Sequence, residues 1–309
     1  MYYCQGLSDD HLLAPDAACF ALRLAPPASN GKQGILFQGK MKANLSPAAR
    51  VYLAGLEITN PEANIDTASL VWMHALVVGY SPLYLAENAD GIRRDWPRVP
   101  LPDSRKILEA SAKLGQQIAA LLDTENEVDG VTAGTIDAFL QTVAVLSRVG
   151  GGSLDPDAGD LAITAGWGHV GKGSATMPGK GQIVRRPYEE AELEAIEQAA
   201  NARGLSVKQV LTLLGPDTRD VYLNDKAYWK NIPPCIWKYY IGGYQVIKKW
   251  LSYREQKLLG RALRTEEARE VTRMARRLAV IVLLQPALDK NYQEVKDNAY
   301  AWPGVRSPS

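Results

Sequence analysis

A glycine-rich segment between residues 150 and 181 limits the folds open to this chain more than any other feature of its sequence. Glycine loses more backbone entropy on ordering than any other residue, so the segment is a poor candidate for a helix. Short apolar runs at 161–164 and 182–184 lie on either side of its second half. This pattern predicts two short strands joined by a long loop.

Most of the remaining chain has the periodicity of amphipathic or buried helices. Ser46 before Pro47 is a good helix cap, and Gly204 is a good helix stop. An alternating run at 218–224 predicts a further strand. The expected helices are 46–57, 66–86 with interruptions at Gly79 and Pro82, 103–123, 188–203, 206–214, 265–286 and 287–299. We therefore expect an α+β fold that is mainly helical, with a small β-sheet and a long glycine-rich loop.

The 309 residues are enough for two domains. Three prolines, Pro97, Pro100 and Pro102, favour an extended and semi-rigid connection at this point. The sequence thus predicts one part over residues 1–100 and a second over residues 101–309.

The composition is that of a globular protein, with 46% hydrophobic and 22% charged residues. No apolar run is long enough to cross a membrane, and the first residues have no signal-peptide pattern. Cys4, Cys19 and Cys235 have neither metal-ligand nor disulfide-framework spacing. These features predict a reduced, cytoplasmic environment and no association with a membrane.

The charge of the chain is unevenly distributed, although its net value is only +1. Residues 221–280 contain 13 Lys and Arg against 5 Asp and Glu, while the rest of the chain contains 22 against 29. Such asymmetry is typical of a lobe that meets a large anion, and a phosphate backbone is the commonest one. A basic helical face exposed to solvent would give the same pattern.

Residues 166–172 read GWGHVGK and match the first seven positions of a phosphate-binding Walker A loop. The eighth position must be Ser or Thr to hold magnesium, but Gly173 stands there. The bulky Trp167 and His169 also occupy positions where a backbone cradle prefers small residues. Nucleotide binding by the loop from Gly166 to Lys172 is therefore only an alternative hypothesis.

No pattern for catalysis stands out. Methylation of a base amine needs Asn or Asp followed by two prolines and an aromatic residue, whereas residues 231–235 read NIPPC. Of the three histidines, His11, His74 and His169, the second lies in an apolar helix and is expected to be a core residue. We therefore expect no catalytic residue, metal ligand or cofactor site in this chain.

Nucleic-acid binding is the best interpretation of residues 222–254, where nine Tyr and Trp residues alternate with Lys and Arg. Basic groups neutralise phosphates, and aromatic rings stack on bases or form the core. Trp229, Trp237 and Trp250 are expected to be mainly core. The glycine-rich loop would let backbone and basic side chains approach DNA. The candidate DNA contacts are Lys172, Lys180, Arg185, Arg186, Lys248, Lys249 and Arg254. Arg185 and Arg186 are the best candidates for bidentate contact with guanine, and Arg254 could instead be a structural ion-pair partner.

Residues 221–255 resemble the C-terminal specificity region of type ISP restriction–modification enzymes and related adenine-specific DNA methyltransferases. The resemblance is carried by YW at 228–229, GGYQV at 242–246, KKWL at 248–251 and YR at 253–254. Residues 84–102 and 165–184 are similar to the same family, and the resemblance covers roughly residues 70–302.

The resemblance implies that the chain reads a short site in double-stranded DNA for a methyltransferase domain or subunit. That partner would transfer a methyl group from S-adenosylmethionine to adenine N6. Residues 1–100 would be a helical adaptor that packs on the partner, and residues 101–309 would be the DNA target-recognition domain. A protein-interaction scaffold that docks on a methyltransferase without reading DNA is the other binding hypothesis.

Overall fold

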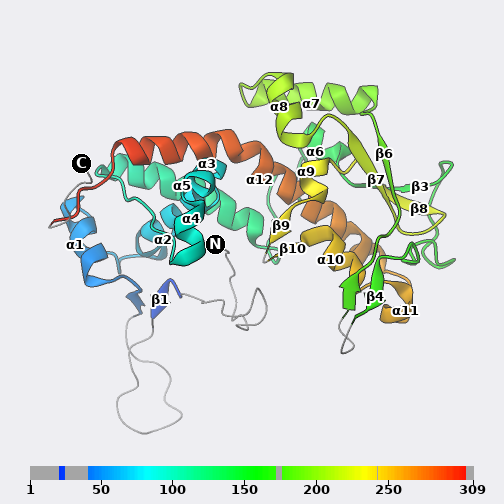
Figure 1. The fold of residues 1–309 in the computed structure, drawn as a ribbon, viewed down its shortest axis with the longest axis horizontal. Helices are drawn as coiled ribbons and strands as arrows, with labels where there is room; N and C mark the ends of the chain where they lie inside the picture. Colours follow the sequence, from blue (N-terminus) through cyan, green and yellow to red (C-terminus); the bar gives the residue numbers. More distant parts are fainter. Residues whose placement is uncertain (1–20, 25–40, 172–175, 242, 304–309) are drawn as a thin grey trace, which may run out of the picture. The chain divides into compact units, whose positions relative to one another are not determined.

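The computed structural model describes residues 21–24, 41–171, 176–241 and 243–303. The chain forms two compact units, one made of residues up to Asp123 and from Leu284 onward, the other of Thr124–Leu283. Helices predominate, and the strands form small antiparallel sheets (Figure 1). The predicted α+β class, mainly helical with a small sheet, is confirmed.

Unit 1 is helical. Its elements are β1 (Arg23–Leu24), β2 (Lys42–Ala43), α1 (Pro47–Gly55), α2 (Ile65–Gly79), α3 (Pro82–Glu87), α4 (Ala89–Arg94), α5 (Arg105–Leu122) and the end of α12 (Thr265–Asp297). The predicted cap of α1 is confirmed, because the Ser46 side chain accepts a hydrogen bond from the Ala49 N–H. Helices α2 and α5 pack closely, since a Cβ on Gly115 would lie 2.0 Å from the Met73 carbonyl oxygen.

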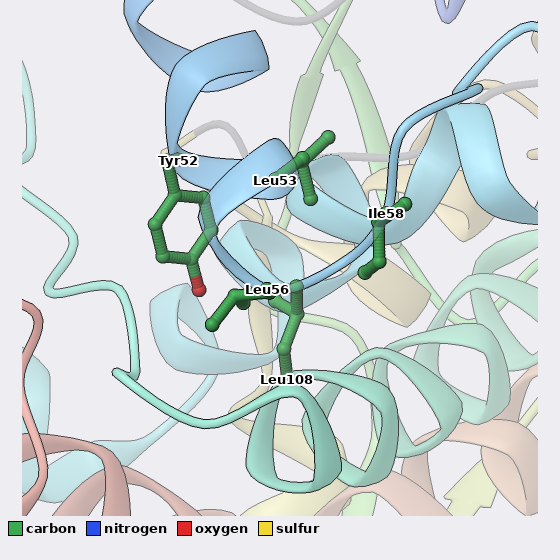
Figure 2. Close-up of a cluster of buried hydrophobic side chains, with 5 residues drawn as sticks. All are labelled: Tyr52, Leu53, Leu56, Ile58 and Leu108. Carbon is green, nitrogen blue, oxygen red and sulfur yellow. The ribbon is translucent and has the colours of Figure 1, made fainter.

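A small apolar cluster joins α1 to α5 in unit 1 (Figure 2). Its members are Tyr52, Leu53, Leu56, Ile58 and Leu108, all buried. The Tyr52 hydroxyl donates a hydrogen bond of 2.6 Å to the carbonyl oxygen of Pro102. Burial of a ring with a satisfied polar tip is the usual way in which tyrosine stabilises a core.

His74 lies in the core of unit 1, as its apolar surroundings in the sequence predict. It is fully buried, and Nε2 lies 2.8 Å from the Pro100 carbonyl oxygen. A carbonyl can only accept, so Nε2 carries the proton, and Nδ1 accepts from the Ser111 hydroxyl at 2.8 Å. Burial lowers the pKa of His74 to about 4. The neutral imidazole therefore ties α2 to α5 and to the proline-rich segment.

The pKa of His74 in the folded protein lies below the unfolded value of 6.5, so folding favours the neutral imidazole. The stability that neutral His74 contributes to the fold is therefore complete above that pH and is lost as the pH falls toward about 4. We expect the free energy of unfolding to fall by about 2 kcal/mol between about pH 8 and about pH 5 through this group alone. Urea unfolding of the wild type and His74→Gln at both pH values measures it. Equal pH dependence in the two proteins would contradict this assignment.

Unit 2 is built on a four-stranded antiparallel sheet with the order β3-β8-β7-β6. Its helices are α6 (Ala138–Thr142), α7 (Glu190–Ala202), α8 (Val207–Leu214), α9 (Pro234–Trp237), α10 (Val246–Ser252), α11 (Gln256–Leu259) and the first part of α12. Its strands are β3 (Val145–Arg148), β4 (Gly168–Val170), β5 (Thr176–Pro178), β6 (Ile183–Arg186), β7 (Thr218–Tyr222), β8 (Ala227–Lys230), β9 (Tyr240–Ile241) and β10 (Tyr244–Gln245).

Tryptophans dominate the interior of unit 2. Trp229 is fully buried and Trp237 is 6% exposed, which confirms two of the three predicted core tryptophans. Trp167 is also fully buried and meets Trp237 edge-on, with ring centroids 5.4 Å apart. Trp250 is only partly buried, and its indole N–H donates to Glu270. The third prediction is therefore wrong, because Trp250 lies on a part of α10 that remains partly open to solvent.

The predicted strand at 161–164 is absent. Leu161 and Ile163 are buried, but their carbonyl oxygens accept single hydrogen bonds from Leu263 and Gln256 instead of joining a ladder. Short apolar runs signal burial, and periodicity alone does not distinguish a buried strand from a buried loop. The predicted strand at 182–184 is present as β6.

The two helices predicted at 265–286 and 287–299 form one helix, α12, with Pro286 inside it. Proline removes one helical hydrogen bond and disfavours a helix interior by about 3 kcal/mol. The helix continues because both flanks are held by packing, with Val282, Leu283 and Leu288 all buried.

The proline-rich segment before α5 lies within unit 1. Pro100 accepts the His74 hydrogen bond, and Pro102 forms a β-bridge with Ala299. The compact units divide at residues 123 and 283 instead. The functional division of the chain at residue 100 stays a prediction.

Candidate nucleic-acid interface

The β4–β5 hairpin, made from the second half of the glycine-rich segment, lies against α10 (Figure 1). The close approach depends on Gly168, because a Cβ there would lie 2.5 Å from the carbonyl oxygen of Ser252 at the end of α10. Gly181 has a similar constraint: a Cβ would lie 2.2 Å from the Trp167 ring, and its φ is +64°. These glycines are therefore required by packing.

The backbone amides of the Walker-like segment bind a side chain of the protein itself. Gly166 N–H donates to Glu255 Oε1 at 3.1 Å, and Trp167 and Gly168 donate to Oε2 at 2.8 and 3.3 Å. Glu255 is 5% exposed. Consecutive amides aimed at one carboxylate form an anion cradle of the kind that phosphate loops use. We call these four residues the Glu255 cradle.

The Glu255 cradle argues against a nucleotide in the same place. A phosphate would have to displace a buried carboxylate, and Trp167 fills the interior where a phosphate cradle needs space. Lys172, the last residue of the Walker-like match, lies outside the described residues. The sequence does not show that Glu255 is the anion bound by these amides.

Lys249 on α10 is held between two tyrosine rings. Its Nζ lies 4.4 Å from the ring centroid of Tyr244 and 4.6 Å from that of Tyr253. The same Nζ donates to the Thr176 carbonyl oxygen of β5 at 3.4 Å. Cation–π attraction of this kind contributes about 0.5–1 kcal/mol at exposed sites. We call Tyr244, Lys249 and Tyr253 the Tyr–Lys cluster.

Lys248 and Arg254 complete the basic residues predicted on and after α10. Arg254 stacks on Trp250, with its guanidinium carbon 4.0 Å from the ring centroid, and its NH1 donates to the Trp250 carbonyl oxygen at 3.4 Å. Arg254 therefore stacks on a residue of the helix that precedes it and forms no ion pair among the described residues. Lys248 is partly exposed.

Arg185 and Arg186 are neighbours on the edge strand β6, but their surroundings differ. The side chain of Arg185 is 72% exposed and pairs with Asp217. The side chain of Arg186 is 17% exposed and binds both oxygens of Glu192 at 2.8 and 2.7 Å. Its Nε also donates to Asp220 at 2.9 Å. These hydrogen bonds raise the pKa of Arg186 above its ordinary value.

The structure thus separates the predicted DNA contacts into groups. Lys249 belongs to the Tyr–Lys cluster, and Lys248 and Arg254 belong to the same helix region. Lys180 is exposed between β5 and β6, and Arg185 is exposed on β6. Arg186 links β6 to α7 and β7, so its guanidinium is engaged inside the protein. Its predicted contact with guanine stays a prediction.

Among the described residues, no group of three or more His, Cys, Asp or Glu side chains is placed to hold a metal ion. No helix in the described part of the chain is long and apolar enough to span a membrane.

These elements make unit 2 a domain that presents cations and aromatic rings on a hairpin and a short helix. The family model described as the type ISP C-terminal specificity domain matches residues 1–280. The chain belongs to this family, the target-recognition domains of type ISP restriction–modification enzymes, so the predicted resemblance is confirmed. Neither the curated proteins nor the solved structures contain a match.

Proposed function

We propose that this chain binds double-stranded DNA sequence-specifically, as the target-recognition region of a system that methylates adenine at N6. The family membership carries the proposal, because a specificity domain implies a DNA target. The methyltransferase domain or subunit would bind S-adenosylmethionine and perform the transfer. The role of this chain would be to read the sequence and present the site.

The cations of unit 2 support this proposal. Lys180 lies just before β6, Arg185 lies on β6 and Lys248 lies on α10, and all three are exposed or partly exposed. Cations of this kind neutralise phosphates and release counterions, which makes affinity fall steeply with salt. The planar guanidinium of Arg185 also has the geometry for a bidentate contact with guanine, provided that it leaves Asp217.

The test is fluorescence-anisotropy binding of the purified chain to a randomised duplex of about 30 base pairs across a salt series. The variant carries Lys180→Glu, Arg185→Glu and Lys248→Glu together. We expect it to bind about 100-fold more weakly, with a shallower dependence of affinity on salt, because each lost phosphate contact lowers the slope by about 1.

The matched control carries Lys106→Glu, Lys113→Glu and Lys290→Glu, which make the same charge change at exposed positions of unit 1. Equal weakening by both triple variants would mean that only net charge matters and would contradict a DNA interface in unit 2. A chain that retains a methyltransferase partner but binds no DNA would instead support the scaffold hypothesis.

A further inference from the structure

The β9–β10 hairpin places its two tyrosines on opposite faces. Tyr244 pairs with Ile241 and Tyr240 pairs with Gln245 in the ladder, and cross-strand partners lie on the same face. The Tyr244 face meets Lys249 of α10, while the Gln245 side chain of the other face donates to the Trp237 carbonyl oxygen. The two tyrosines therefore have different environments on one small element.

The Tyr–Lys cluster exposes aromatic surface to solvent. Tyr244 is 48% exposed and Tyr253 is 51% exposed, although each ring is fixed by the same ammonium group. Met177 of the adjoining β5 is 43% exposed. The exposed parts of the two rings make the surface around the Lys249 ammonium more aromatic than a phosphate site requires.

The contacts of Lys249 also favour a flat ligand over a phosphate. Its ammonium already meets two rings and the Thr176 carbonyl oxygen, so it is held in place by groups of the protein. The exposed parts of the Tyr244 and Tyr253 rings remain accessible to a ligand. A nucleobase has π-faces that stack on tyrosine, whereas a phosphate has none.

We propose that the Tyr–Lys cluster is a stacking site for an unstacked DNA base, in which Tyr244 and Tyr253 contact the base and Lys249 positions their rings. This inference rests on the proposed DNA-binding function. Bases inside a regular duplex are covered by their neighbours, so the ligand is a base that is extruded, bulged or single-stranded. Tyr240, on the other face of the hairpin, does not take part.

The test compares a perfect duplex with the same duplex carrying one unpaired 2-aminopurine, by anisotropy and by 2-aminopurine fluorescence. The wild type is expected to bind the bulged duplex about tenfold more tightly and to quench the fluorescence, because stacking contributes about 1–3 kcal/mol per base. Tyr244→Ala is expected to lose this preference, which lowers its affinity for the bulged duplex by about tenfold. Tyr244→Phe keeps the ring and is expected to stay within about twofold of the wild type.

Tyr240→Ala is the matched control, because it removes an exposed tyrosine from the same hairpin on the opposite face. It should leave bulge binding and quenching unchanged. Tight binding of the perfect duplex with no preference for the bulge and no quenching would overturn the stacking site and leave DNA binding intact. Equal losses for Tyr240→Ala and Tyr244→Ala would also overturn it. Absence of binding to either duplex at low salt would overturn the proposed function itself.

Discussion

Arg186→Met is expected to lower the free energy of unfolding by about 3–5 kcal/mol. The guanidinium bridges Glu192 and Asp220, whose side chains are 5% and 11% exposed, and its removal leaves two carboxylates with little solvent and no cation between them. Glu192 also accepts from the Glu189 N–H in the capping box of α7. The methionine keeps most of the apolar stem, so the loss reports on charge. Urea unfolding at about pH 7 measures it.

Arg185→Met is the control for this experiment, since it makes the same change one residue earlier on the same strand. Its side chain is 72% exposed, and exposed ion pairs contribute at most about 1 kcal/mol. We expect the two variants to separate two roles: Arg186→Met loses stability, whereas Arg185→Met keeps stability and loses DNA affinity. Equal destabilisation by both would contradict the division between a structural and a surface arginine.

Glu255→Ala is expected to destabilise the chain by about 3 kcal/mol or more. The change removes the acceptor of three backbone N–H groups, those of Gly166, Trp167 and Gly168, and two of these bonds are buried. Hydrogen bonds to charged groups contribute about 1.5–3 kcal/mol each, and buried donors without a partner add a desolvation penalty. Thermal or urea unfolding measures the change.

Gln256→Ala, at the next position, is the matched control because its side chain is exposed and its backbone N–H still donates to the Ile163 carbonyl oxygen. Its effect should stay within about 0.5 kcal/mol. Glu255→Gln retains an acceptor oxygen without the charge and should fall between the two. A Glu255→Ala protein as stable as Gln256→Ala would mean that the cradle does not hold the β4–β5 hairpin in place.

Local signals in the sequence predicted much of the helical structure. Ser46, Ser206 and Gly204 mark helix ends because capping and left-handed stops depend on single residues. Pro286 shows the limit of such rules, because packing on both sides of a proline overrides its local preference. Whether a buried run such as 161–164 forms a ladder depends on partners far away in the chain, which periodicity does not contain.

The candidate site was predictable by residue type but not by role. Sequence reasoning found Lys249 and the tyrosines around it, because basic and aromatic residues alternate there. It could not distinguish Arg185 from Arg186. Successive side chains of a strand point to opposite faces, and only the structure shows that the Arg186 side chain points toward the protein while that of Arg185 points toward solvent. It also missed Glu255, whose function depends on amides almost ninety residues earlier in the chain.

Sequence-specific binding to DNA is the central claim, and selection from a pool of randomised duplexes tests it most directly. The affinity of the enriched sequence is then compared with that of a scrambled duplex at the same salt concentration. We predict a ratio of about 10³ or more, the range that separates specific from non-specific binding. A ratio near one, with no sequence enriched, would contradict the claim that this chain reads a DNA target.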